Sequence, residues 1–146
     1  MPPVNIYIPK KLQKEFINSG LEAYSHGKEY MEVFSLEKKP TGYYIETFYK
    51  LPFSKQTKGE VAFELDSFLA FQNKMKEENR YFGSIHTHID MFTDAIPSEA
   101  DYLSSAKWGE ELLGICTIWE VGNRVKKTKT AINYFITNPP CIKYYI

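Results

Sequence analysis

The order of hydrophobic patterns along the chain is the feature that most constrains its fold. Several short runs rich in aromatic and β-branched residues alternate like strands, and segments with helical spacing separate some of them. Strands are predicted at 4–8, 29–37, 42–51, 60–65, 81–87, 112–121 and 128–136. Helices are predicted from Pro9 to about Gly27, from Asp66 to about Asn79, and from Ser98 onward. Because strands and helices do not alternate regularly, the pattern predicts an α+β fold with a mixed, largely antiparallel sheet flanked by helices.

Turn signals join some of these strands into hairpins. Residues 38–41, which contain Pro40, separate two of the runs, and a turn at 122–123 separates the last two. The chain has no internal repeat, low-complexity tract or linker. Its 146 residues are therefore predicted to form one domain, residues 1–146.

The second predicted helix has a polar start and an apolar face. Asp66 is a residue type that caps helices by accepting a hydrogen bond from the backbone. Four side chains of this helix are expected to face the core: Phe68, Leu69, Phe71 and Met75.

Composition excludes several classes of function. Apolar residues make up 43% of the chain, and 18 basic side chains balance 18 acidic ones. This neutral balance argues against a surface for nucleic acid or an anionic membrane. The one basic cluster, at 124–129, is predicted to be a solvated hairpin. No apolar run is long enough to span a membrane, and no signal peptide is recognisable. Two cysteines are too few for a disulfide framework in a chain of this size. A cytoplasmic location is therefore expected.

The segment 83–88, Gly-Ser-Ile-His-Thr-His, carries the most informative side chains. His86 and His88 are two residues apart on a predicted strand, so both side chains point from the same face. Asp101 lies in the first turn of the helix that begins at Ser98 and offers an oxygen ligand from the next element. Two imidazoles and one carboxylate can hold a metal ion in a three-ligand site that leaves a fourth position for water.

Simpler interpretations exist for each part of this site. The two histidines can be polar residues on an exposed face, and Ser98 with Asp101 can be only a capping box, with serine at the N-cap and an acid three residues later. The whole chain has three histidines, which argues against a chance pairing of two of them. Together, the histidines and the aspartate favour a metal site.

A metal-activated water also needs a general base, usually a carboxylate outside the coordination shell. Glu29 and Glu32 both lie on the predicted strand 29–37. They lie three positions apart, an odd number, so they face opposite sides of that strand, and at most one can point into the site.

These residues resemble the motif of the JAMM (MPN+) zinc metalloproteases, which remove ubiquitin or ubiquitin-like proteins. The resemblance rests on Glu29, on His86-Thr87-His88 and on the segment 98–101, Ser-Glu-Ala-Asp, and it extends over nearly the whole chain. It implies a JAMM/MPN-like, that is cytidine-deaminase-like, fold. It also implies one Zn²⁺ per chain, bound by His86, His88 and Asp101, with Glu29 as the general base and Ser98 stabilising the charge on the attacked carbonyl.

Two departures from the family pattern concern the segment 89–97. It has nine residues where the family usually has seven, and Ile89 replaces the proline that commonly follows the second histidine. Longer loops cost little free energy, so the ligands can still meet. Glu32 also resembles the family's glutamate and stays an alternative general base, although the distance of Glu29 from the opening segment fits better.

The resemblance implies a zinc-dependent isopeptidase or peptidase that cleaves after the C-terminus of ubiquitin or a ubiquitin-like protein. Such a conjugate is the expected substrate, no nucleic acid or membrane partner is expected, and a homodimer is possible. Three alternatives stay open: a non-catalytic MPN-type scaffold subunit, a phage or bacterial zinc hydrolase of cell-wall peptide, and a RadC-like zinc hydrolase.

Overall fold

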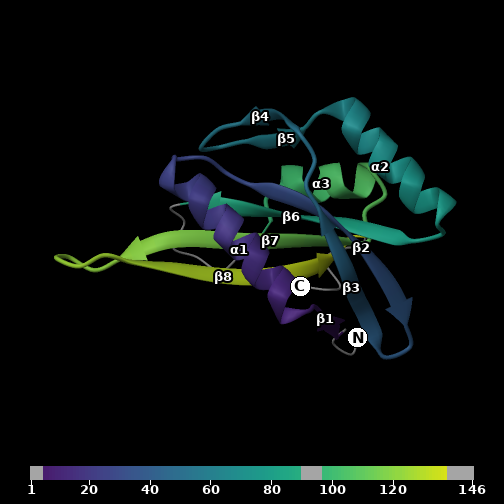
Figure 1. The fold of residues 1–146 in the computed structure, drawn as a ribbon, viewed down its shortest axis with the longest axis horizontal. Coiled ribbons are helices and arrows are strands. Elements are labelled where there is room, and N and C mark those ends of the chain that lie inside the picture. The colour runs from purple at the N-terminus through teal and green to yellow at the C-terminus, as the bar shows by residue number, and fades with distance from the viewer. Residues whose placement is uncertain (1–4, 90–96, 138–146) are drawn as a thin grey trace.

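The computed structural model describes residues 5–89 and 97–137, which form three helices and eight strands (Figure 1). The helices are α1 (Lys10–Ser25), α2 (Leu65–Glu77) and α3 (Glu99–Lys107). The strands are β1 (Ile6–Tyr7), β2 (Met31–Lys39), β3 (Gly42–Tyr49), β4 (Phe53–Gln56), β5 (Val61–Phe63), β6 (Tyr81–Ile89), β7 (Leu112–Val121) and β8 (Lys127–Ile136). No helix within these described ranges is long and apolar enough to cross a membrane.

Six strands form the main sheet in the order β1-β3-β2-β6-β7-β8, and β4 and β5 form a separate hairpin. The pairs β2–β3, β2–β6 and β7–β8 are antiparallel, whereas β1–β3 and β6–β7 are parallel. The sheet is therefore mixed and largely antiparallel, which confirms the predicted α+β class.

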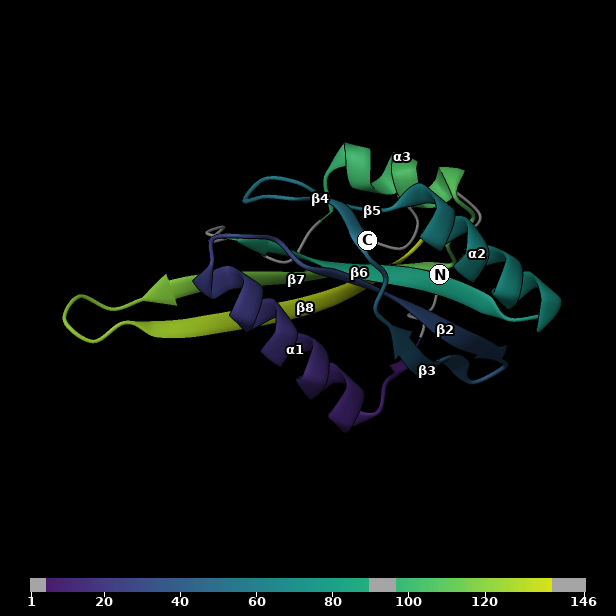
Figure 2. The same cartoon turned by 45° about the horizontal axis from the view of Figure 1, so that its top comes forward.

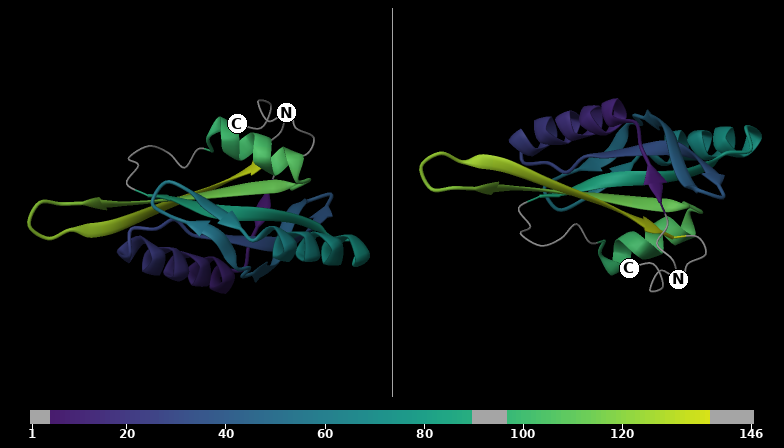
Figure 3. Two further views of the ribbon diagram at one scale, coloured as in Figure 1. Left: turned by 90° about the horizontal axis from the view of Figure 1, so that it is seen from above. Right: turned by 90° about the horizontal axis from the view of Figure 1, so that it is seen from below.

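The helices cover both faces of this sheet. Figure 2 shows α1 on one face and α2 and α3 on the other, and Figure 3 shows α1 and α3 on opposite sides. A glycine lets α1 approach closely, since a Cβ on Gly20 would lie 3.1 Å from the Cγ2 atom of Thr87 on β6. The β4–β5 hairpin lies beside α2 and α3, on the face opposite α1 (Figure 2).

The alternation of side chains along the central strands gives each face its own core. One core lies between the sheet and α1 and contains Phe16, Phe34, Ile85 and Ile118 among its members. The other face carries two clusters, one under α2 and one under α3. The even-numbered residues of β6 from Phe82 to His88 point to this second face, which brings Ser84, His86 and His88 to the same side of the sheet.

Several predicted boundaries are wrong. The first strand is only Ile6–Tyr7, the run 60–65 contributes only Val61–Phe63, and the sequence pattern did not predict strand β4. Asp66 lies in the first turn of α2 and is not its N-cap, which is Glu64 and makes no side-chain capping bond. Leu69 is 36% exposed, because α2 presents only Phe68, Phe71 and Met75 to the core.

The basic cluster lies where the sequence predicts it, at the tip of the β7–β8 hairpin. This hairpin extends beyond the rest of the sheet (Figure 1), and residues 121–130 are exposed. Lys126 forms an ion pair with Glu120 at 3.9 Å. The predicted loop 89–97 begins with the last residue of β6, and its residues 90–96 lie outside the described part of the chain.

Candidate metal centre

Strand β6 positions both histidines. His86 pairs with Met31 on the antiparallel strand β2 and with Ile115 on the parallel strand β7, so hydrogen bonds on both sides fix its backbone. Thr87 points to the opposite face, where its backbone N–H donates to the carbonyl oxygen of Tyr30 at 2.9 Å and its Oγ1 accepts from the Tyr30 N–H at 2.8 Å. His86 and His88 therefore project together from one face, as the sequence predicts.

The third ligand candidate, Asp101, enters from the start of α3. The Ser98 side chain accepts a hydrogen bond from the Asp101 backbone N–H at 3.1 Å, and the Asp101 carboxylate accepts one from the Ser98 backbone N–H at 2.8 Å. This reciprocal pair is the capping box that the sequence predicts. The capping interpretation and the metal interpretation are therefore compatible, because one carboxylate serves in both.

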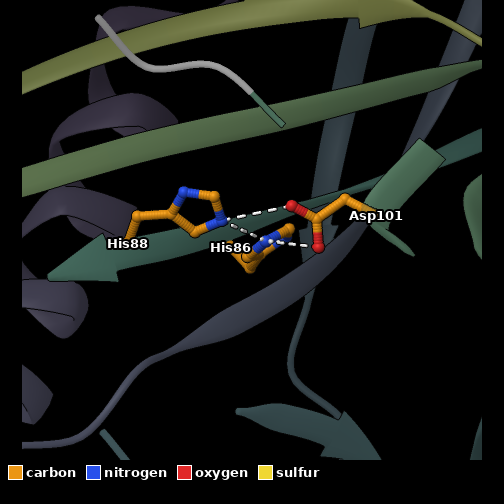
Figure 4. A group of neighbouring side chains, drawn as sticks. All are labelled: His86, His88 and Asp101. Carbon is orange, nitrogen blue, oxygen red and sulfur yellow. Dashed lines mark hydrogen bonds and ion pairs between the residues drawn. The ribbon is translucent and has the colours of Figure 1, made fainter. Parts of the chain in front are cut away.

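The three side chains meet at one point (Figure 4). The Nε2 atoms of His86 and His88 are 3.0 Å apart, and they lie 3.3 and 3.2 Å from the two carboxylate oxygens of Asp101. A first-row metal ion with bonds of about 2.0–2.1 Å separates adjacent ligands by roughly 3.0–3.4 Å. The donor atoms and their separations therefore fit a metal ion, and His86, His88 and Asp101 could hold one.

Electrostatics keep the carboxylate of Asp101 charged. Burial disfavours the charged form, but hydrogen bonds to His86 and His88 outweigh that effect and hold the pKa of Asp101 well below its usual range. The side chain is thus an anion at neutral pH, as a metal ligand must be.

Glu29 lies in the same cavity as these three residues. The backbone of Glu29 is tied to the β4–β5 hairpin: its N–H donates to the Thr57 carbonyl oxygen at 2.8 Å, and its carbonyl oxygen accepts from Gln56 Nε2 at 2.8 Å. The residue is 8% exposed, and burial raises the pKa of its carboxyl group to about 7, although His88 opposes the shift. A carboxyl group with such a pKa can accept or donate a proton at neutral pH.

Glu32 lies away from the cavity. It pairs across the strands with Ile85, which belongs to the core under α1, and the hydroxyl of Tyr30 donates to its Oε2 at 2.6 Å. Burial raises the pKa of Glu32 as well, but its side chain is on the α1 face of the sheet. Of the two glutamates, the structure brings only Glu29 to the candidate metal centre.

The cavity itself has a volume of about 760 Å³ and is open to solvent. Ser98 and the three ligand candidates line it, and so do residues of the β4–β5 hairpin and the start of α2. The lining includes the apolar side chains of Phe63, Phe68 and Trp108. The candidate site therefore combines polar and apolar surfaces in one cavity.

Sequence reasoning missed two groups of cavity residues. One is the β4–β5 hairpin, which holds Glu29 but whose first strand, Phe-Ser-Lys-Gln, lacks an apolar alternation. The other is Glu110 together with Ser84, which also line the cavity. No local signal singles out Glu110, since Glu110 and its neighbour Glu111 both precede the apolar run 112–119.

Comparisons with known proteins extend the description of the fold. No family model matches the chain, and no curated protein matches its sequence. The solution structure of protein DSY2949 from Desulfitobacterium hafniense is similar over 89% of this chain and 89% of that chain, with 17% identity and a TM-score of 0.56. The N-terminal domain of STIL from Trichoplax adhaerens is similar over 90% of this chain and 42% of that chain, with 9% identity and a TM-score of 0.43. The first similarity supports the overall fold, and neither bears on the chemistry of the site.

Proposed function

We propose that this chain is a zinc-dependent hydrolase of peptide or isopeptide bonds, of the JAMM (MPN+) type and with that family's fold. The observation that carries the proposal is the convergence of His86, His88 and Asp101 beside Glu29 in one open cavity. Neither protein DSY2949 nor the STIL domain is named as a hydrolase, so the proposal rests on this geometry and on the sequence motif.

The roles of the residues are those that the resemblance to the JAMM motif implies. When bound, zinc supplies Lewis acidity, which activates water for attack at neutral pH and polarises a carbonyl group. Glu29 takes a proton from the attacking water as the new carbon–oxygen bond forms. It then passes that proton to the nitrogen of the breaking carbon–nitrogen bond, so that the amine leaves neutral.

In this proposal Ser98 stabilises charge on the carbonyl oxygen. Its Oγ accepts from the Asp101 N–H, and that bond leaves the hydroxyl hydrogen available for donation. A preorganised donor of this kind typically contributes about 2.7–4 kcal/mol to the stabilisation of the transition state.

We further propose that the substrate is a conjugate or precursor of ubiquitin or a ubiquitin-like protein. Hydrolysis of a cell-wall peptide would use the same residues and differs only in what the cavity binds. A non-catalytic scaffold role is disfavoured, because an unused site has no need for a complete set of ligands with a carboxyl group of pKa about 7 beside it.

Metal analysis tests the proposal directly. The purified protein and a His86→Ala variant are compared by inductively coupled plasma mass spectrometry, with His26→Ala as the matched control, since His26 is an exposed histidine on the end of α1. The proposal expects about one zinc per chain in the protein and in the control, and none in His86→Ala. Two histidines and one carboxylate also suit Fe²⁺. Iron as the bound metal, or no uptake of zinc on reconstitution, would overturn the zinc hydrolase.

A further inference from the structure

A second set of polar side chains lies in the same cavity, one step beyond the candidate metal ligands. Ser84 is two residues before His86 on β6, and Ser105 is four residues after Asp101 on α3. Two residues of a strand span about 6–7 Å and one helical turn about 5–6 Å. Each element therefore carries a metal ligand and, about 6 Å further along the cavity, a serine.

Glu110 joins these two serines. Its side chain makes hydrogen bonds with Ser84 and Ser105, and the residue is only 6% exposed although it lines the cavity. Its backbone is fixed, because the Glu110 N–H donates to the Ser105 carbonyl oxygen at 3.0 Å. Within residues 5–89 and 97–137, no cationic side chain forms an ion pair with Glu110.

The hydrogen bonds around Glu110 determine what this set presents to a ligand. The Thr137 hydroxyl donates to the Glu110 carbonyl oxygen at 2.7 Å, and the Ser105 hydroxyl donates to Thr137 Oγ1 at 3.1 Å. The hydrogen of Ser105 is thus already used, so its oxygen is the acceptor in the bond with Glu110, and the protonated carboxyl group of Glu110 is the donor. When Glu110 loses that proton, its carboxylate and the Ser105 oxygen form a group of acceptors.

A buried group of acceptors is complementary to a ligand rich in N–H donors. A carboxyl group without a cationic partner is costly to ionise in such a place, and burial raises the pKa of Glu110 to about 7. An ammonium group would supply both a positive charge beside the Glu110 carboxylate and N–H groups for the acceptors.

The apolar surroundings indicate how the ammonium group is carried. Leu113 and Trp108 line the cavity together with these residues. An indole ring attracts a cation, and a leucine side chain packs against methylene groups. A primary ammonium on a short aliphatic stem fits both.

We propose that Ser84, Ser105 and Glu110 form a second subsite, beside the candidate metal centre, that binds a primary ammonium group on an aliphatic stem. This inference rests on the proposed function and deepens it. The substrate then carries a free, lysine-like amine near the bond that is cleaved.

Binding of two small probes with the same stem tests the subsite. Butylammonium chloride and 1-butanol are titrated into the ¹⁵N-labelled protein, and the shifts of the Ser84 and Ser105 amide resonances are followed by NMR. Butylammonium is expected to bind at least tenfold more tightly than butanol. Glu110→Gln is expected to weaken butylammonium binding at least tenfold. The matched control is Glu111→Gln, since Glu111 is also buried but is paired with Lys38 at 3.0 Å.

The subsite would be overturned if the two probes bind with equal affinity, or if Glu110→Gln binds butylammonium as tightly as the unmodified protein does. Glu110 would then be only a structural bridge between β6 and α3. If Glu110→Gln fails to fold, Ser84→Ala removes one contact of the subsite and keeps the carboxyl group, and a several-fold weaker affinity for butylammonium is expected. Zinc content is measured on the same samples. If the protein contains no zinc but still binds butylammonium more tightly than butanol, the result contradicts the proposed zinc hydrolase. If it contains zinc but binds the two probes equally, the result contradicts the ammonium subsite alone.

Discussion

The carboxylate of Asp101 accepts a hydrogen bond from the backbone N–H of Ser98 at 2.8 Å, and the same carboxylate faces both histidines. The residue that completes the capping box of α3 is therefore also the candidate metal ligand on that helix. The start of the helix and the geometry of the metal centre depend on a single side chain, and substitutions can separate the two roles.

Ser98→Ala and Asp101→Asn are expected to affect different properties. Ser98→Ala removes the cap and should lower the free energy of unfolding by about 1 kcal/mol while zinc still binds. Asp101→Asn keeps an oxygen acceptor near the Ser98 N–H but removes the charge, and should weaken zinc binding at least 100-fold. Chemical denaturation and chelator competition measure the two effects. Equal zinc affinity in Asp101→Asn and the unmodified protein would exclude Asp101 as a ligand.

Glu29→Gln should abolish hydrolysis of a ubiquitin-like fusion and leave the zinc content unchanged. The reason is that glutamine can occupy the same place but cannot take a proton from water. Glu32→Gln is the control, because Glu32 lies on the α1 face of the sheet and bonds to Tyr30. Hydrolysis rates and metal content of both variants are compared. Loss of activity in Glu32→Gln alone would assign the general base to Glu32.

Glu110 should make the stability of the metal-free protein depend on pH. Its pKa is raised by burial from an ordinary acidic value to about 7, so between about pH 5 and pH 7 the folded state binds more protons than the unfolded state. The free energy of unfolding therefore falls as pH rises through this window, by up to about 3 kcal/mol from this group.

Glu110→Gln removes that contribution and serves as the comparison. Urea denaturation at pH 5 and pH 8, with chelator present, should show the variant gaining stability relative to the unmodified protein as pH rises. Glu29 titrates in the same direction in both proteins, so its effect cancels in the difference. Parallel pH dependence of the two proteins would contradict the prediction.

Gly83→Ala should destabilise the protein severely, by about 3 kcal/mol or more. A Cβ at this position of β6 would overlap the carbonyl oxygen of Leu112 on β7 and lie 2.7 Å from the ring of Phe34 on β2. Neither backbone nor a buried ring can move aside easily. Thermal unfolding measures the effect, with Gly59→Ala as the control, since a Cβ on Gly59 meets nothing within 4 Å. A melting temperature equal to that of the control would show that the sheet can adjust.

The parts of the site that depend on local patterns could be predicted from the sequence. The alternation of β6 places His86 and His88 on one face, and the signal at Ser98 and Asp101 marks the start of α3 correctly. The choice between Glu29 and Glu32 depends on contacts distant in sequence. Glu29 precedes β2, which begins at Met31, and the β4–β5 hairpin holds it in the cavity.

The role of Glu110 could not be predicted for a related reason. Charged residues directly before an apolar strand are usually exposed, and nothing local distinguishes Glu110 from Glu111. Its burial follows from the packing of α3 against β7 and β8, and its side chain joins Ser84 on β6 to Ser105 on α3. Tertiary structure alone makes this carboxyl group part of the cavity.

The separation of the ligands along the chain has a consequence for folding. A metal ion shared by His88 on β6 and Asp101 on α3 would act as a crosslink that closes the connecting segment into a loop, much as a disulfide does. Crosslinks reduce the entropy of the unfolded chain and so stabilise the folded state. This stabilisation changes slowly with the size of the closed loop, by about 0.6 kcal/mol for each doubling of its length. The connection between strand and helix can therefore differ in length among relatives of this protein at little cost to the crosslink.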